Sequence, residues 1–174
     1  MEPVVVLLRG VNVGRANRLS MSDLRAVLTD LGGQDVTTYL QSGNAVLRAD
    51  PQGLAARVEA GLAERLGLAV RVVVRTGPQL ARTVEANPFP HKTAEPTLLH
   101  VAFVEPPPSA DHVEALGTRH GDDELAAGDG VVYLSYAAGT RTSPLSRVVP
   151  RLGGVVTTRN WSTVTRLAEL AGAT

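Results

Sequence analysis

The chain of 174 residues is 44% hydrophobic and 20% charged, which suffices for one domain with a sizeable core or for two small ones. Its 17 basic and 17 acidic residues balance, so it lacks the basic excess of a dedicated nucleic-acid binder. It has no cysteine, which excludes disulfides, thiol catalysis and cysteine-based metal centres. The apolar run at residues 4–8 is too short for a signal peptide or a membrane span, so we expect a cytoplasmic protein.

The first part of the chain predicts strands and helices in the order βαββαβ. Residues 3–8 form a continuous Val-rich run, typical of a buried strand. Ser20, with Asp23 three residues later, predicts the capped start of a helix. Two strands, a helix opened by Asp50-Pro51 and a last strand follow at residues 35–40, 44–48, 50–66 and 69–75. This order is typical of a ferredoxin-like sandwich, with two helices on one face of a four-stranded antiparallel sheet.

The rest of the chain predicts a similar order after a proline-rich stretch. Thr76 caps a short helix over residues 78–86, and "NPFPHKTAEP" (residues 87–96) is the predicted linker. Strands are predicted at residues 97–104, 124–126, 131–136 and 155–157, and helices at residues 110–116, 144–150 and 160–171. We therefore predict an α+β protein of two ferredoxin-like (βαββαβ-type) units packed together. The predicted parts are residues 1–76, a helix and linker over 77–96, and a second unit over 97–174.

The segment "RGVNVG" (residues 9–14) ends the first strand with an unusual density of donors. Its glycines permit positive φ angles, so that backbone N–H groups can form a nest for an anion. Side-chain donors come from Arg9, Asn12, Arg15, Asn17 and Arg18. The segment matches neither a phosphate-binding loop nor a dinucleotide-binding fingerprint. The alternative is a turn in which the asparagines bond their own backbone, and the residues alone leave both interpretations open.

The segment "YLQSGN" (residues 39–44) is a second polar cluster, with Ser42 and Asn44 as candidate ligand-binding residues. A tight hairpin turn is the favoured interpretation. No histidine or carboxylate lies at a spacing that would make Ser42 a nucleophile. In a ferredoxin-like unit we expect this hairpin at the opposite end of the sheet from the turn after the first strand. If the second strand ends early, Gln41, Ser42 and Asn44 would not meet Arg9, and the sequence leaves open whether the polar clusters converge.

The segment "TTRNWSTVTRL" (residues 157–167) predicts a helix N-terminus capped by Thr158 or Asn160. Arg159 would face the positive end of the helix dipole, which is unfavourable unless an anion or an acidic side chain lies between them. Core packing is favoured over base stacking for Trp161. The four histidines are scattered, and the acidic run at residues 122–124 predicts a solvated turn rather than a cation site, so no metal site is expected.

Four motifs resemble a known family: "LLRGVNVGRANRLSMSDL", "DVTTYLQSGNAVL", "NPF" and "TTRNWSTVTRL". In this order they resemble the bacterial family called domain of unknown function 1697. The resemblance implies a two-part α+β protein with ferredoxin-like elements and implies no activity, substrate or cofactor. Arg15 replaces the second glycine of the family's usual "NVGG", and Leu47 replaces its usual Phe. The signature residues here are Arg9, Gly10, Asn12, Gly14, Asn17, Met21, Ser42, Gly43, Asn44, Arg159, Asn160 and Trp161.

The leading functional hypothesis is a cytoplasmic protein that binds a small anionic ligand. Its polar site would combine residues 9–17 with the segment around Arg159 and Asn160. Nucleic-acid binding across an open sheet face is the second hypothesis, which the 3% aromatic content disfavours because stacking needs exposed rings. A structural or oligomerising protein, whose motif residues serve turns and caps, is the third. No triad, metal cluster or cofactor loop supports an enzyme, no cofactor or membrane partner is expected, and no oligomeric state is predicted.

Overall fold

The computed structural model describes residues 1–14 and 17–172 and divides the chain into two compact units. Unit 1 comprises Met1–Leu80 and Leu167–Thr174, and unit 2 comprises Ala81–Arg166. The division therefore falls inside the helices α3 (Gly77–Glu85) and α6 (Trp161–Leu170). The proline-rich segment 87–96 belongs to unit 2, where it contains the short 3-10 helix η1 (Pro90–Lys92). Strands and helices occur in both units, so the protein is of the α+β class.

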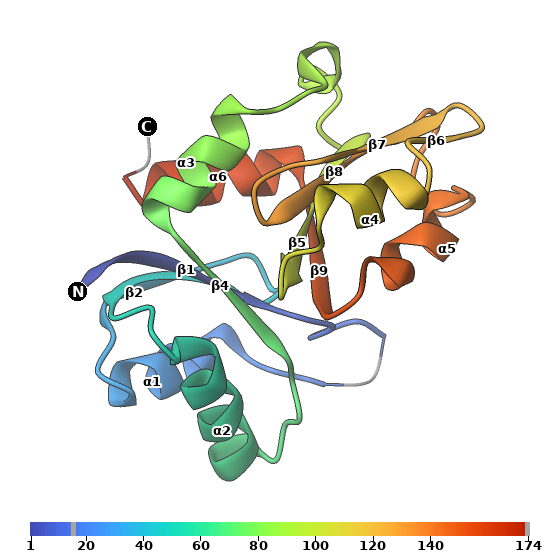
Figure 1. Cartoon of the computed structure of the whole chain (residues 1–174). Coiled ribbons are helices and arrows are strands. Elements are labelled where there is room, and N and C mark those ends of the chain that lie inside the picture. The colour runs from blue at the N-terminus through green and yellow to red at the C-terminus, as the bar shows by residue number, and fades with distance from the viewer. Residues whose placement is uncertain (15–16, 173–174) are drawn as a thin grey trace. The chain divides into compact units, whose positions relative to one another are not determined.

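Unit 1 is a four-stranded antiparallel sheet with the strand order β2-β3-β1-β4. The helices α1 and α2 cover one face of this sheet (Figure 1). All five residues from Val4 to Leu8 are fully buried, as a central strand requires. Along the chain the elements are β1 (Glu2–Leu8), α1 (Met21–Asp30), β2 (Gln34–Tyr39), β3 (Asn44–Ala49), α2 (Leu54–Leu66) and β4 (Val72–Thr76).

The start of α1 follows from local chemistry that the sequence predicted. Ser20 is the N-cap, and its hydroxyl accepts a hydrogen bond from the backbone N–H of Asp23 at 3.0 Å. The same hydroxyl donates to the Asp23 carboxylate at 2.6 Å. Leu24 and Leu28 then fall on one side of the helix and are fully buried in the core under the sheet.

The start of α2 differs from the prediction that Asp50-Pro51 opens the helix. The chain first makes a turn, in which the Leu54 N–H donates to the Pro51 carbonyl at 3.2 Å. Gly53 has φ +64°, a left-handed conformation that cannot lie inside a right-handed helix. The helix therefore begins at Leu54, directly after this glycine.

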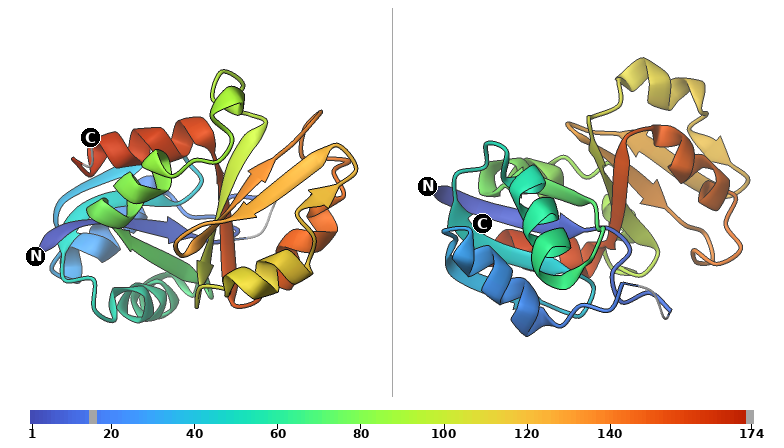
Figure 2. Two further views of the ribbon diagram at one scale, coloured as in Figure 1. Left: turned by 45° about the horizontal axis from the view of Figure 1, so that its top comes forward. Right: turned by 90° about the horizontal axis from the view of Figure 1, so that it is seen from below.

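Unit 2 repeats the connectivity of unit 1 in a five-stranded sheet with the order β6-β7-β8-β5-β9. In this sheet β7-β8-β5-β9 correspond to β2-β3-β1-β4, and the two-residue strand β6, which the sequence did not predict, extends the edge. The helices α4 and α5 lie on one face (Figure 2). The elements are β5 (Leu99–Glu105), α4 (Ala110–Ala115), β6 (Arg119–His120), β7 (Asp123–Ala127), β8 (Val131–Ser135), α5 (Leu145–Val148), the 3-10 helix η2 (Val149–Leu152) and β9 (Val155–Asn160).

Two helix boundaries in unit 2 follow from local chemistry. Ser109 caps α4, because its hydroxyl accepts from the His112 N–H at 3.1 Å. The helix opened by Ser143 ends early: α5 changes into η2 at Val149, next to Pro150. Within the described residues, no helix is long and apolar enough to cross a membrane.

We expect Ser20→Ala to lower the free energy of unfolding by about 1 kcal/mol, because the variant leaves the Asp23 N–H without its acceptor. Urea denaturation followed by circular dichroism measures the change. Ser20→Thr keeps both the N-cap acceptor and the hydroxyl that donates to the Asp23 carboxylate, and it should retain most of the stability. Equal losses in the two variants would contradict the capping role.

Candidate functional site

The loop after β1 and the turn between β2 and β3 lie at the same end of the unit 1 sheet. The antiparallel register pairs Leu7 with Asn44, which brings the start of β3 beside the end of β1. The Leu8 N–H donates to the Gly43 carbonyl at 2.8 Å. The expectation that this hairpin lies at the opposite end of the sheet was therefore wrong. We call residues 9–20 the β1–α1 loop and residues 40–43 the β2–β3 turn.

Asn12 joins these two segments through its side chain. Its amide Nδ2 donates to the Gln41 carbonyl at 2.7 Å and to the Leu19 carbonyl at 2.8 Å. Its Oδ1 accepts from the Leu19 N–H at 3.0 Å. Asn12 has φ 56°, a left-handed conformation that asparagine adopts more readily than most residues. All of these contacts are to backbone groups, so Asn12 fixes the shape of the site.

The other amides of the two motifs also bond to the backbone. Asn17 has φ 49°, its Nδ2 donates to the Gly10 carbonyl at 3.3 Å, and its own carbonyl accepts from the Asn12 N–H at 3.0 Å. Asn44 is fully buried, and its Nδ2 donates to the Tyr39 carbonyl at 3.0 Å and to the Ser42 hydroxyl at 2.9 Å. These side chains stabilise the loop and the turn, as the structural alternative predicted.

A hollow of about 370 Å³ lies between the β1–α1 loop and the β2–β3 turn. Two large apolar side chains on its wall are unusually exposed, Val13 at 70% and Leu40 at 53%. Leu40 also has φ 58°, a conformation that costs a non-glycine residue about 1 kcal/mol or more. The wall of the hollow therefore carries a leucine that is both strained in its backbone and exposed to solvent. The lining residues are Val11, Asn12, Val13, Leu40, Gln41 and Ser42.

The charged residues of the β1–α1 loop are all arginines: the sequence contains no acidic residue between positions 9 and 22. Arg9 and Arg18 are exposed, and neither forms an ion pair with another described residue. Arg15, predicted as a further donor, lies outside the described residues. Next to Arg9, the Arg71 guanidinium is neutralised by Glu59 at 3.1 Å. This end of unit 1 therefore carries positive charge that no described acidic residue neutralises.

The third predicted cluster lies in unit 2, and its local structure differs from the prediction. The strand β9 extends past the predicted residues 155–157, so residues 158 and 159 belong to it instead of a helix start, and Arg159 is a strand residue with 9% exposure. Its Nη1 donates to the Thr157 hydroxyl at 2.8 Å and to the Thr158 carbonyl at 2.9 Å. Burial lowers the pKa of Arg159 to about 10, so its guanidinium is still charged at neutral pH.

The residues after Arg159 have structural roles. Asn160 accepts from the Thr163 N–H at 3.0 Å, which makes it the cap of α6. Trp161 is 7% exposed, in agreement with the preferred interpretation of a core residue. A direct contact of Arg159, Asn160 or Trp161 with a ligand stays a prediction.

The family of this chain follows from a comparison with sequence families. The sequence model described as "Protein of unknown function (DUF1697)" matches residues 1–133. The chain belongs to this family. The matched range contains three of the four motifs that suggested it, and the segment 157–167 lies beyond the match.

Two further comparisons, with curated proteins and with solved structures, gave different results for this DUF1697 protein. A search of curated proteins found no match. Among solved structures, the chain is similar to "conserved bacterial protein SP0830 from Streptococcus pneumoniae", with a TM-score of 0.77 and 22% sequence identity. The alignment covers 97% of this chain and 98% of the other. At this identity the likeness concerns the fold alone.

Sequence reasoning missed three features of unit 2 in this DUF1697 protein, and the first two are a buried aspartate and a pocket. Asp123, predicted in a solvated turn, is 5% exposed, and its carboxylate accepts from the Ala137 N–H at 2.8 Å and from the Ser143 hydroxyl. A pocket of about 350 Å³ also lies beside Arg82 and Tyr133, on segments that carried no motif. Within residues 1–14 and 17–172, no group of three or more potential metal ligands lies close together.

His100, in β5, is a third feature without a sequence signal. Its ring lies edge-on to Tyr136, with 5.1 Å between the ring centroids. Its Nδ1 is buried and has no hydrogen-bond partner among the described residues. Burial lowers the pKa of His100 from 6.5 to about 4. His100 is therefore neutral in the folded DUF1697 protein at physiological pH.

We expect Gly43→Ala to destabilise unit 1 by about 2 kcal/mol or more, because a Cβ at φ +75° is strained and would also overlap its neighbours. That Cβ would lie 2.6 Å from Val11 Cγ2 and 2.7 Å from Leu8 Cβ. Gly10→Ala is the matched control, since Gly10 has φ +67° and nothing within 4 Å of a Cβ. Urea denaturation should show the larger loss for Gly43→Ala, and equal losses would contradict close packing of the turn on the loop.

The pKa of His100 predicts a stability that falls in acid. Between pH 6.5 and about 4 the unfolded chain binds a proton on His100 that the folded chain excludes, so stability decreases as pH falls through this window and is unaffected above it. His100→Phe keeps an aromatic ring and removes the titration. Thermal unfolding of both proteins from pH 4 to 8 measures the difference. Parallel profiles would show that His100 is not the group responsible.

Proposed function

We propose that this protein binds a small anionic ligand with an apolar portion at the hollow between the β1–α1 loop and the β2–β3 turn of unit 1. The anionic group would meet Arg9 and Arg18, and the apolar portion would cover Val13 and Leu40. The observation that carries the proposal is that the two segments bordering one hollow carry a strained, exposed leucine and, in the same loop as Val11 to Val13, two exposed arginines without an ion-pair partner among the described residues. Exposed apolar surface and stored backbone strain are both typical of binding sites.

A comparison of the two units supports a role beyond connecting a strand to a helix. In unit 1 the connection from β1 to α1 takes residues 9–20, with three arginines and two asparagines. In unit 2 the corresponding connection, from β5 to α4, takes only residues 106–109, "PPPS". The shared strand order therefore does not require a long, donor-rich loop, and its length in unit 1 needs another explanation.

Backbone donors add to the proposed anion site. The N–H groups of Gly10 and Val13 have no hydrogen-bond partner in the ranges that the structure describes. Both residues lie in a loop where positive φ angles recur, at Gly10, Asn12 and Gly14. Such alternation is the backbone pattern of anion-binding nests. Because Asn12 already fixes the loop, little conformational entropy would be lost when a ligand binds.

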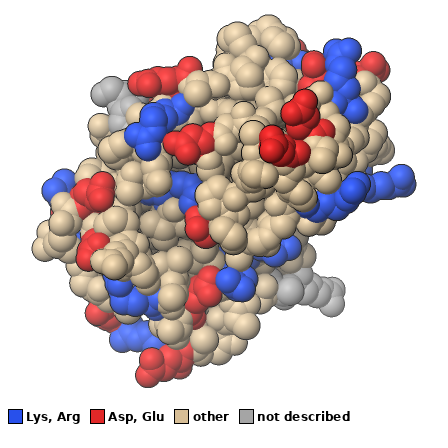
Figure 3. Space-filling view, viewed as in Figure 1, with Lys and Arg blue, Asp and Glu red and all other residues tan. Residues whose placement is uncertain are grey.

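Nucleic acid is a less suitable partner for this surface. On the face drawn in Figure 3, the described basic and acidic side chains are interspersed, and no broad basic area is visible. A surface that binds the phosphate backbone of a nucleic acid requires such an area.

We further propose that both units are ferredoxin-like, on the grounds of their strand order and their paired helices on one face. The cytoplasmic location stays a prediction from composition.

We expect phenyl phosphate to bind the wild-type protein more tightly than inorganic phosphate, because only the former covers the exposed apolar side chains. Isothermal titration calorimetry measures both affinities. Arg9→Ala/Arg18→Ala should weaken both ligands by about tenfold or more, through the loss of charge-assisted hydrogen bonds. Arg141→Ala/Arg147→Ala removes the same charge from exposed positions in unit 2 and should bind normally. No binding by the wild type, or equal losses in both double variants, would refute the proposal.

Leu40→Asn separates the apolar contribution from the electrostatic one. Asparagine tolerates φ 58° better than leucine, so the variant should be at least as stable as the wild type. It should lose the preference for phenyl phosphate and keep its affinity for inorganic phosphate. A stable variant with an unchanged preference would exclude Leu40 from the site.

A further inference from the structure

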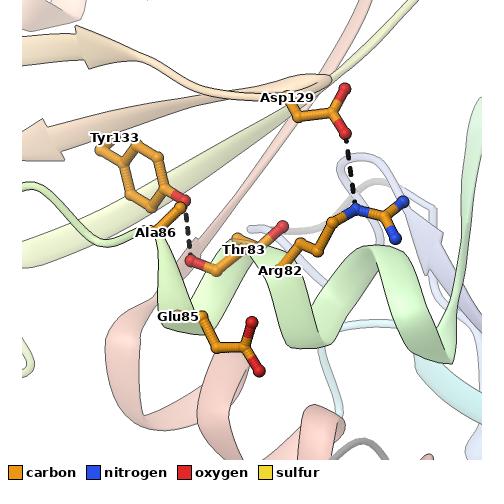
Figure 4. A pocket seen from close by; sticks show the side chains of 6 residues that line it. All are labelled: Arg82, Thr83, Glu85, Ala86, Asp129 and Tyr133. Atoms are coloured by element: carbon orange, nitrogen blue, oxygen red, sulfur yellow. Dashed lines mark hydrogen bonds and ion pairs between the residues drawn. The ribbon is translucent and has the colours of Figure 1, made fainter.

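The α3 segment of unit 2 and the β7–β8 turn enclose a second pocket, separate from the hollow of unit 1. Its volume is about 350 Å³, at the lower end of the range for small-molecule sites. Figure 4 shows Arg82 reaching from α3 toward Asp129 on the turn, and the Tyr133 hydroxyl directed at the Thr83 carbonyl. The lining residues are Arg82, Thr83, Glu85, Ala86, Asp129 and Tyr133.

The wall of this pocket is rigid and apolar at Tyr133. The ring is 1% exposed, and its hydroxyl donates to the Thr83 carbonyl at 2.7 Å. Burial and then the charge of Asp129 raise the pKa of Tyr133 to about 12, so the hydroxyl remains a donor at neutral pH. Gly128 allows the turn to pack here, because a Cβ would lie 2.6 Å from the Tyr133 ring. Tyr133 therefore fixes the floor of the pocket in place and exposes almost none of its own ring.

The rim of the pocket carries an ion pair that is easy to open. Arg82 Nε lies 3.6 Å from Asp129 Oδ2, and the two side chains are 55% and 83% exposed. At this distance the pair lacks a hydrogen bond, unlike Arg71–Glu59 at 3.1 Å or Arg119–Glu124 at 3.3 Å. Exposed ion pairs of this kind contribute about 0–1 kcal/mol to the stability of the fold. A ligand that separates Arg82 from Asp129 therefore has only this small free energy to compensate.

We propose that this pocket binds a free α-amino acid with an apolar or aromatic side chain. The ligand carboxylate would take Arg82, its ammonium group would take Asp129, and its side chain would lie against the exposed Ala86 above the buried Tyr133. A ligand with only one charge leaves either Arg82 or Asp129 without its former partner. Glu85 adds a second carboxylate to the rim, which disfavours acidic side chains and dicarboxylates.

Saturation-transfer NMR and calorimetry with three related compounds test this proposal. L-phenylalanine has both charges, phenethylamine lacks the carboxylate, and 3-phenylpropanoate lacks the ammonium group. We expect L-phenylalanine to bind best. Arg82→Gln and Asp129→Asn should each weaken it by about tenfold or more, since each removes one charge-assisted contact. Both substitutions are on exposed side chains, so folding should be retained, and circular dichroism checks this.

Arg119→Gln is the matched control, because Arg119 forms an exposed ion pair in the same unit away from the pocket. It should bind L-phenylalanine like the wild type. No saturation transfer to L-phenylalanine in the wild type would overturn the proposal. So would equal affinities for the three compounds, or equal losses in Arg82→Gln and Arg119→Gln.

Discussion

The antiparallel pairing of β1 with β3 is the constraint on which the geometry of unit 1 depends. Because Leu7 pairs with Asn44, the end of β1 and the β2–β3 turn are brought to one end of the sheet. Only in this register can Asn12 bond the carbonyls of Gln41 and Leu19 with one amide. A one-residue slip would turn the buried side chains of β3 toward the other face, so core packing and loop geometry specify the same alignment.

The elements that the sequence predicted well are those with short-range causes. Ser20 bonds a residue three positions ahead, and Ser109 does the same, so the capping pattern is visible along the chain. The predicted start of α2 was wrong because proline is tolerated at a first helical position. The left-handed conformation of Gly53, which delays the helix to Leu54, cannot be predicted from the residue type, because glycine adopts positive and negative φ angles with similar ease. The extent of β9 was underestimated because two of its alternating buried positions are polar, at Thr157 and Arg159.

The sequence predicted where one segment of the candidate site lies, and it did not predict the contacts within the site. Clustered glycines and donors identified the β1–α1 loop, yet they did not reveal that Asn12 and Asn17 would bond the backbone while Arg9 stays exposed. That distinction depends on which segment faces the loop, and this is a property of strand order. The position of the hairpin was wrong for the same reason. The exposure of Leu40 had no signal at all, because an apolar residue beside a strand is expected to be buried.

The two units show a repetition that is nearly absent from their sequences. In each, a buried arginine in the last strand of the repeated order donates to the carbonyl of the preceding residue, Arg75 to Val74 and Arg159 to Thr158. The next residue then caps a helix by accepting an N–H three positions ahead, as Thr76 and Asn160 do.

Against this shared framework, the segments at corresponding sheet ends differ in length and charge: a long basic loop in unit 1, and "PPPS" with an acidic hairpin turn in unit 2. Features that the fold requires should recur in both units. Features found in only one unit, such as the arginines of the β1–α1 loop and the strained leucine, are not required by the shared framework, and the proposed binding function rests on them.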